Sequence, residues 1–84
     1  MTAPNATTAD WMRANLAAML GIDPARITDA ARLEADLGAY SLDMIELVMT
    51  SEDHFRIGIA DADLKGIATF GEAVALVDAK RTAA

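Results

Sequence analysis

The sequence contains no cysteine among its 84 residues. A disulfide framework, a zinc-finger-type site and a cysteine nucleophile are therefore excluded. A chain of this length holds one small domain, which buries a smaller share of its surface than a larger protein does. We therefore expect a fold of modest stability that is held together by apolar packing.

Basic residues are also scarce, and long apolar runs are missing. Seven Lys and Arg stand against thirteen Asp and Glu, so the net charge is −6. This balance disfavours nucleic acid and anionic membranes, which both reward cationic side chains. Composition does not tell whether the acidic charge serves to bind basic protein partners or only to keep the chain soluble.

No stretch approaches the roughly 18 apolar residues that cross a bilayer, and residues 1–10 lack the features of a signal peptide. We therefore expect a cytoplasmic protein without membrane insertion.

Apolar spacing and helix-end signals predict an all-α fold. A first helix, capped by Thr8 or Asp10, ends at Gly21 and carries its larger apolar side chains near one face, namely Trp11, Leu16, Met19 and Leu20. A long connection over residues 22–40 follows. A second helix is expected to begin at Ser41, which would serve as its N-cap, and to run to about Phe55.

The remainder of the chain predicts one short helix and one long helix. Residues 61–65 suffice for one or two helical turns, and the last helix starts near Thr69 and ends at Lys80 and Arg81. The alternation at residues 57–59 is too short for a strand. We therefore expect a flexible segment over residues 1–8, one domain over 9–81 and a tail over 82–84.

The helix expected over residues 41–55 has two apolar faces. At about 100° per residue, one side is nearly free of charge and is assigned to the core, with Met44, Leu47, Val48, Ser51 and Phe55. The opposite side combines an apolar strip of Leu42, Ile45 and Met49 with Glu46, Glu52, Asp53 and Arg56. Flanking helices could bury both sides. The charges favour exposure of the strip, because carboxylates are rarely buried unpaired.

Negative charge is concentrated around this helix. Residues 34–63 contain eight acids and one base, a net charge of −7, whereas the remaining residues contain five acids and six bases, a net charge of +1. A charged stretch is often only a solvated face. Here it surrounds an apolar strip, as in protein docking surfaces.

Residues 36–49 read D-L-G-A-Y-S-L-D-M-I-E-L-V-M. This stretch closely resembles the acyl carrier protein family, in which the pattern D-L-G-A-D-S-L-D-x-V-E-L-V-M is common. The likeness continues through residues 52–61 and 67–70. It implies a four-helix bundle with a long first loop and a short third helix.

The resemblance further implies a non-enzymatic carrier function. Ser41 would receive phosphopantetheine from a phosphopantetheinyl transferase, and the thiol of that arm would carry acyl groups as thioesters. The chain would be a monomer, and enzymes with basic surfaces that load or process the acyl group would dock on a face made of Tyr40, Leu42, Asp43, Ile45, Glu46, Met49, Glu52, Asp53, Ile59 and Asp61. The bundle core is expected to contain Leu16, Leu20, Leu33, Leu47, Val48, Phe55, Ile67, Val74 and Val77.

Three positions depart from the family pattern. Tyr40 replaces an Asp, Ser51 stands where an apolar core residue is usual, and Ala60 replaces a Pro. Tyr40 removes a carboxylate beside the attachment serine. Tyr40 is therefore consistent with a specialised pathway, with an engineered change, or with the alternative function of a carrier-like interaction module that is never modified. The cargo stays open among ordinary fatty acids, specialised lipids, polyketide starters and aminoacyl groups.

No residue pattern indicates catalysis or a metal site. His54 is the only histidine, and its position on the second helix predicts a surface or boundary residue. Glu52 and Asp53 are adjacent, so on a helix they point in different directions and do not form a paired site.

Overall fold

The computed structural model describes residues 7–83. It contains the helices α1 (Thr8–Leu20), α2 (Ser41–Phe55) and α3 (Phe70–Ala83), with 3-10 turns η1 (Pro24–Arg26) and η2 (Asp61–Leu64). Among the described residues there is no β-strand, only an isolated bridge between Arg32 and Thr69. The all-α prediction is confirmed, but the expected short third helix is a four-residue 3-10 turn.

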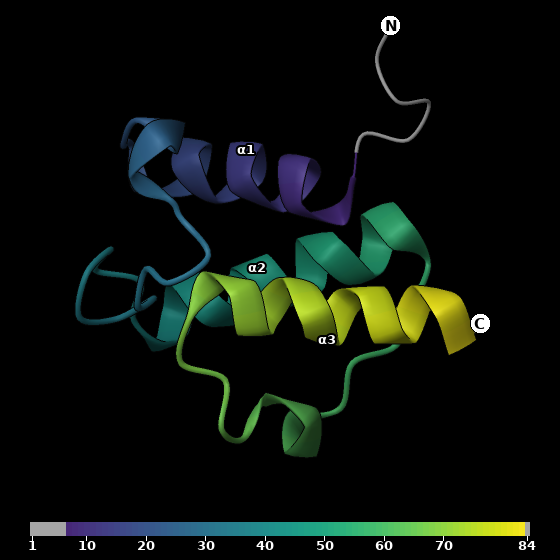
Figure 1. Cartoon of the computed structure of the whole chain (residues 1–84). Helices are drawn as coiled ribbons and strands as arrows, with labels where there is room; N and C mark the ends of the chain where they lie inside the picture. The colour runs from purple at the N-terminus through teal and green to yellow at the C-terminus, as the bar shows by residue number, and fades with distance from the viewer. Residues whose placement is uncertain (1–6, 84) are drawn as a thin grey trace, which may run out of the picture.

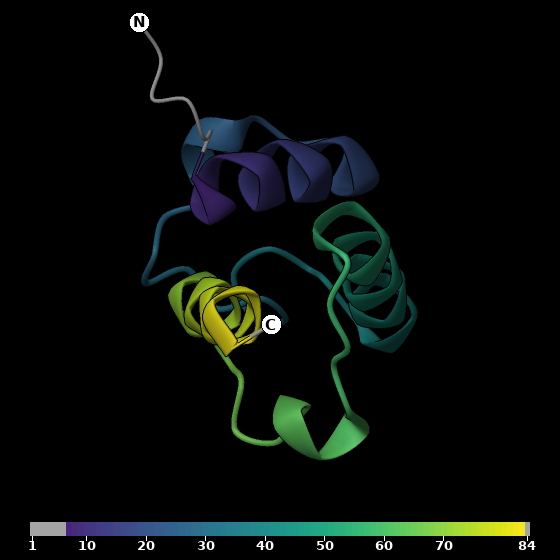
Figure 2. The same ribbon diagram turned by 90° about the vertical axis from the view of Figure 1, so that its right-hand side faces the viewer.

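The three helices enclose one core. The helix α1 packs against both α2 and α3, and the views in Figures 1 and 2 place it across one side of that pair. The turn η2 lies on the opposite side, at the end of two loops (Figure 2). Because α2 and α3 lie on either side of the core, side chains must fill the space between them.

The ends of α1 and α3 differ from the prediction. Thr7, rather than Thr8 or Asp10, caps α1 by accepting a hydrogen bond from the Asp10 N–H at 3.1 Å. Thr8 is buried, and its hydroxyl donates to Asp78 of α3. The helix thus starts within the segment expected to be flexible, residues 1–6 of which lie outside the described residues. At the other end, α3 continues to Ala83, into the expected tail.

The core combines helical residues with residues of the long loop. Four predicted core residues are buried: Leu16, Leu33, Leu47 and Val77. The other five are half-buried: Leu20, Val48, Phe55, Ile67 and Val74. Four further buried residues are absent from the predicted core: Met12, Ile27, Leu37 and Phe70.

In α1, the buried stripe consists of residues 8, 12 and 16. Trp11 is half-buried and stacks on His54 with ring centroids 4.1 Å apart.

Backbone hydrogen bonds tie the long loop to the start of α3. The Leu33 N–H donates to the Ala68 carbonyl at 2.8 Å, and the Phe70 N–H donates to the Ala31 carbonyl at 2.9 Å. Thr69 and Glu72 then form a reciprocal cap, each side chain accepting from the other residue's N–H. The loop over residues 22–40 is therefore part of the packed structure, which fixes where α2 begins.

Candidate functional site

A tight turn delivers the chain to the start of α2. Leu37 and Ala39 are buried, and the Ala39 N–H donates to the Leu33 carbonyl at 2.8 Å. Between them Gly38 has φ +72°, a left-handed conformation that glycine adopts without steric cost. The two buried side chains anchor the loop, so the residues that follow emerge at the surface.

The carboxylate of Asp36 closes this turn. It accepts hydrogen bonds from the Arg32 N–H at 2.8 Å and from the Arg32 guanidinium at 3.2 and 3.3 Å. These hydrogen bonds lower the pKa of the Asp36 carboxyl below its ordinary value. The bond from the Arg32 N–H has the larger effect, and the bond from the guanidinium has the next largest. Asp36 therefore stays ionised at neutral pH and acts as a structural clasp beside the candidate site.

Ser41 is the first helical residue of α2 and is exposed. The expected N-cap at Ser41 is wrong, because Tyr40 occupies the cap position with an extended backbone. Asp43 compensates, since its carboxylate accepts from the Tyr40 N–H at 3.2 Å. The Ser41 hydroxyl is thus not needed as a cap, and it stands at a helix end where free N–H groups and the dipole favour an anion.

The predicted apolar strip of α2 is exposed. Leu42 is 76% exposed, Met49 58% and Ile45 55%, and the neighbouring Tyr40 is 60% exposed. The opposite side of the helix is the buried or half-buried one, as the charge pattern predicted. A continuous exposed apolar strip on a small protein is typical of an interaction surface.

Acidic residues near this strip differ in how they are engaged. Glu46, Asp53 and Asp61 are exposed. Glu52 is half-buried, and its carboxylate accepts from the Ile59 N–H at 2.8 Å. Ile59 itself packs against the core. Of the residues predicted for docking, Glu52 and Ile59 therefore hold the loop after α2 in place.

A groove of about 540 Å³ opens beside Ser41. Its walls come from three parts of the chain: the loop before α2, the first turns of α2, and the segment around η2. Most of the side chains that line it are apolar, and the residues are Arg32, Leu33, Glu34, Ala35, Ala39, Tyr40, Ser41, Met44, Ile45, Leu64, Ile67 and Ala68.

Comparison with known proteins identifies the family. The family model for the phosphopantetheine attachment site matches residues 10–77. The acyl carrier protein of Thermotoga maritima is 44% identical over 61 residues, covering 73% of this chain and 75% of the relative. The chain belongs to the acyl carrier protein family.

A solved structure agrees with this assignment. The acyl carrier protein from Enterococcus faecalis superposes with a TM-score of 0.74 at 27% sequence identity, over 87% of this chain and 92% of that one. Acyl carrier proteins are carriers rather than enzymes, and their cofactor is phosphopantetheine. The fold and the family implied by the sequence are thus confirmed.

The site fits the phosphopantetheine group of acyl carrier proteins. Ser41 offers an exposed hydroxyl at the start of α2 for a phosphodiester, and the adjoining groove offers an apolar wall for a flexible chain. The group, when bound, would supply the thiol that this cysteine-free chain lacks. Ser41 would hold it, and Met44 and Ile67 are among the groove residues along which it could lie.

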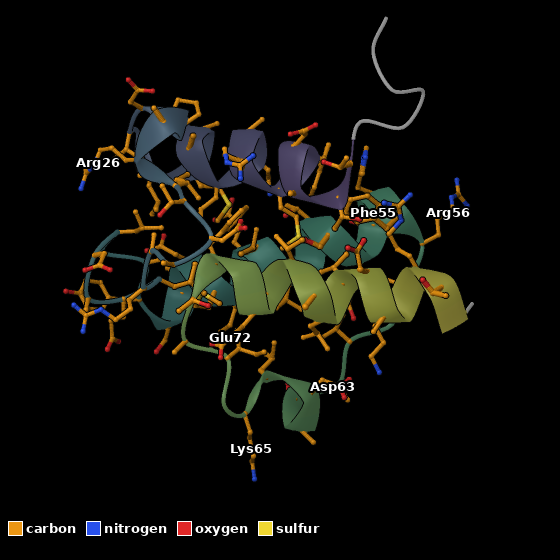
Figure 3. The ribbon with its side chains drawn as sticks, viewed as in Figure 1. Arg26, Phe55, Arg56, Asp63, Lys65 and Glu72 are labelled. Atoms are coloured by element: carbon orange, nitrogen blue, oxygen red, sulfur yellow. The ribbon has the colours of Figure 1, made fainter. Side chains whose placement is uncertain are left out.

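The structure accounts for one departure from the acyl carrier pattern. Ala60 stands where a Pro is usual, and its N–H donates to the Asp63 carboxylate at 2.9 Å. A proline has no N–H and could not make this bond. Asp63 also pairs with Lys80 of α3 at 3.0 Å. The pKa of the Asp63 carboxyl is lowered mainly by the hydrogen bond from Lys80 and next by the one from the Ala60 N–H. Figure 3 shows Asp63 between η2 and α3, with Lys65 pointing away from the bundle.

The prediction missed the far wall of the groove. Glu34, Leu64 and Ala68 line it together with Arg32, whose guanidinium already pairs with Asp36. These residues come from loops and from the last position of η2, and no periodic pattern marks them. The motif at residues 36–43 predicted the candidate site, whereas the groove depends on how the loops fold back.

Residues 7–83 contain neither a membrane-spanning helix nor a cluster of metal-ligating side chains. No helix in this range is long and apolar enough to cross a membrane. Nor do these residues bring together three or more His, Asp or Glu side chains that could hold a metal ion.

Proposed function

We propose that Ser41 is the phosphopantetheine attachment residue and that the chain presents acyl thioesters to partner enzymes. The observation that carries this proposal is the place of Ser41, exposed at the first position of α2 and beside an apolar groove. The D-S-L pattern of the family supports it, since the serine of that pattern is matched here at position 41.

The residues of this chain bind and orient rather than catalyse. The start of α2 provides backbone N–H groups and the positive end of a helix dipole, which stabilise a phosphodiester on the serine oxygen. Phosphopantetheine supplies the thiol on which an acyl group is carried. The turn over residues 36–40, anchored by Leu37 and Ala39, keeps Ser41 at the surface where a transferase can reach it.

Partner enzymes are proposed to dock on the exposed side of α2. Leu42, Ile45 and Met49 supply apolar contact, and Asp43, Glu46, Asp53 and Asp61 supply negative charge around them. Basic surfaces on the transferase and on the enzymes that load or process the acyl group would complement this face. We infer that the carrier works as a monomer in the cytoplasm.

Intact mass spectrometry of the protein from its own host tests the attachment. We expect the mass to rise by one phosphopantetheine group, and we expect Ser41→Ala to lose that increase completely. Because Ser41 is not the helix cap, the variant should keep the thermal stability of the wild type. A host-purified wild type without the group would support the unmodified interaction module, and a labelled Ser41→Ala would disprove the site.

A further inference from the structure

Two adjacent hydroxyl groups in α2 have opposite surroundings. The Thr50 hydroxyl contacts the Glu46 and Leu47 carbonyls at 2.9 and 3.1 Å and accepts from the Asn15 amide at 2.8 Å. Ser51 is completely buried, and its hydroxyl has no hydrogen-bond partner among residues 7–83. Since buried polar groups are nearly always paired, the Ser51 hydroxyl requires an explanation.

Ser51 lines a small cavity in the core. The cavity has a volume of about 20 Å³ and lies between α2 and α3, where Val48 and Leu76 also contribute to its wall. Among the described residues that surround it, Ser51 supplies the only polar side chain. A water molecule would fit by volume, but it needs two or more polar partners, and the side chains of this wall offer one. Water is therefore a poor partner for the Ser51 hydroxyl.

The cavity adjoins the groove beside Ser41. Met44, Leu64 and Ile67 line both spaces, so these three flexible side chains form the partition between them. Ser41 and Ser51 are ten residues apart on one helix, which corresponds to about 15 Å along its axis. The cavity itself has room for about one water molecule, so a flexible arm on Ser41 would bring the end of its cargo to Ser51 only when Met44, Leu64 and Ile67 move aside.

We propose that the Ser51 hydroxyl selects an acyl cargo that keeps a ketone or hydroxyl oxygen on its carbon chain. This inference rests on the proposed function. Such an oxygen would give the buried hydroxyl the hydrogen-bond partner that it lacks, in a place where water serves poorly. A fully saturated chain would leave Ser51 unpaired. The cargo class is therefore the product of a thioester condensation that has not been completely reduced.

Amide-linked pantetheine analogues, loaded enzymatically onto the full chain, test this selection. The probes are an octanoyl chain and octanoyl chains with one ketone at the β, δ or ζ carbon. In the wild type, the best-placed ketone should raise the unfolding temperature by about 4 °C more than the octanoyl chain does. In Ser51→Ala the order should reverse, because the ketone is then buried without a partner.

Thr50→Ala is the matched control, since it removes a hydroxyl from the same helical turn but not from the cavity wall. It should keep the wild-type preference for a ketone. Methyl NMR shifts of Met44, compared with those of exposed Met49, report whether a chain passes the partition. Loaded chains that leave Met44 unchanged, or a wild type without ketone preference, would overturn the inference. If none of the analogues loads on Ser41, the proposed function is overturned as well.

Discussion

The two ends of α2 are built for different purposes. At its C-terminal end the side chains are engaged: His54 stacks on Trp11, and the Arg81 guanidinium lies 4.5 Å above the Phe55 ring centroid. At its N-terminal end, Leu42 and Ile45 are exposed next to Ser41. The same helix therefore anchors the bundle at one end and offers unpaired apolar surface at the other.

This difference indicates where stability and function reside. The contacts at the C-terminal end join α1, α2 and α3, so they hold the three helices together. The N-terminal end depends on the loop before it. The Asp43 carboxylate accepts a hydrogen bond from the Tyr40 N–H, and the Asp36 carboxylate accepts one from the Arg32 N–H. Surface substitutions at the N-terminal end should thus change recognition with little effect on folding.

The largest expected effect comes from removing an aromatic ring at the anchoring end. Phe55→Ala loses the edge contact to Trp11 and the contact with Arg81. Because Phe55 is only half-buried, we expect a loss of about 2 kcal/mol in the free energy of unfolding. Leu42→Ala, at the other end, should change it by less than about 0.5 kcal/mol. Urea denaturation measures both, and equal losses would refute the division of the helix.

Charge reversal should act at the opposite end. Glu46→Lys places a cation beside the apolar strip, and we expect association with a basic partner enzyme to slow by about tenfold at low salt. The effect should shrink as salt rises. Asp10→Lys, the same charge change near the anchoring end, is the control. If Asp10→Lys slows association as much as Glu46→Lys, docking does not centre on the strip.

Tyr40 adjoins Ser41 at the exposed end of α2, so its substitution should change modification more than folding. Tyr40→Asp restores the carboxylate that acyl carrier proteins commonly have before the attachment serine, and we expect loading by a general transferase to quicken a few-fold. An Asp at the cap position should also stabilise α2 slightly, since Tyr40 provides no side-chain cap. Time courses of modification for the wild type, Tyr40→Asp and Tyr40→Phe decide this. An unchanged rate for Tyr40→Asp would remove the argument for a specialised pathway.

Acid should loosen the loop before α2 by a smaller amount. The pKa of Asp36 is lowered in the fold, so its contribution to stability is present above the pKa of the unfolded chain and is lost as the pH falls through the folded value. The window therefore lies below about pH 4. Asp36→Asn should reduce the acid dependence of unfolding, whereas Glu34→Gln, a nearby exposed control, should preserve it. If the free energy of unfolding falls with pH in the same way for the wild type and Asp36→Asn, Asp36 does not stabilise the turn.

Short-range patterns in the sequence predicted the exposed strip and the position of Ser41. Helical periodicity separates the two sides of α2, and the charges among Leu42, Ile45 and Met49 predict which side faces water. Helix ends were less predictable. Thr7 and Tyr40 occupy the cap positions, because a cap depends on backbone conformation as well as on the side chain.

The helical class, the placement of Ser41 and the face that α2 turns to solvent all follow from the amino-acid order alone, because they depend on periodicity and on a local motif. The remaining features depend on contacts between segments that are distant in the chain. Met12, Ile27 and Phe70 enter the core through packing between distant segments, and the groove forms where the loop before α2 meets η2. The lack of a hydrogen-bond partner for the Ser51 hydroxyl also depends on tertiary packing, since the side chains that surround this hydroxyl come partly from other helices.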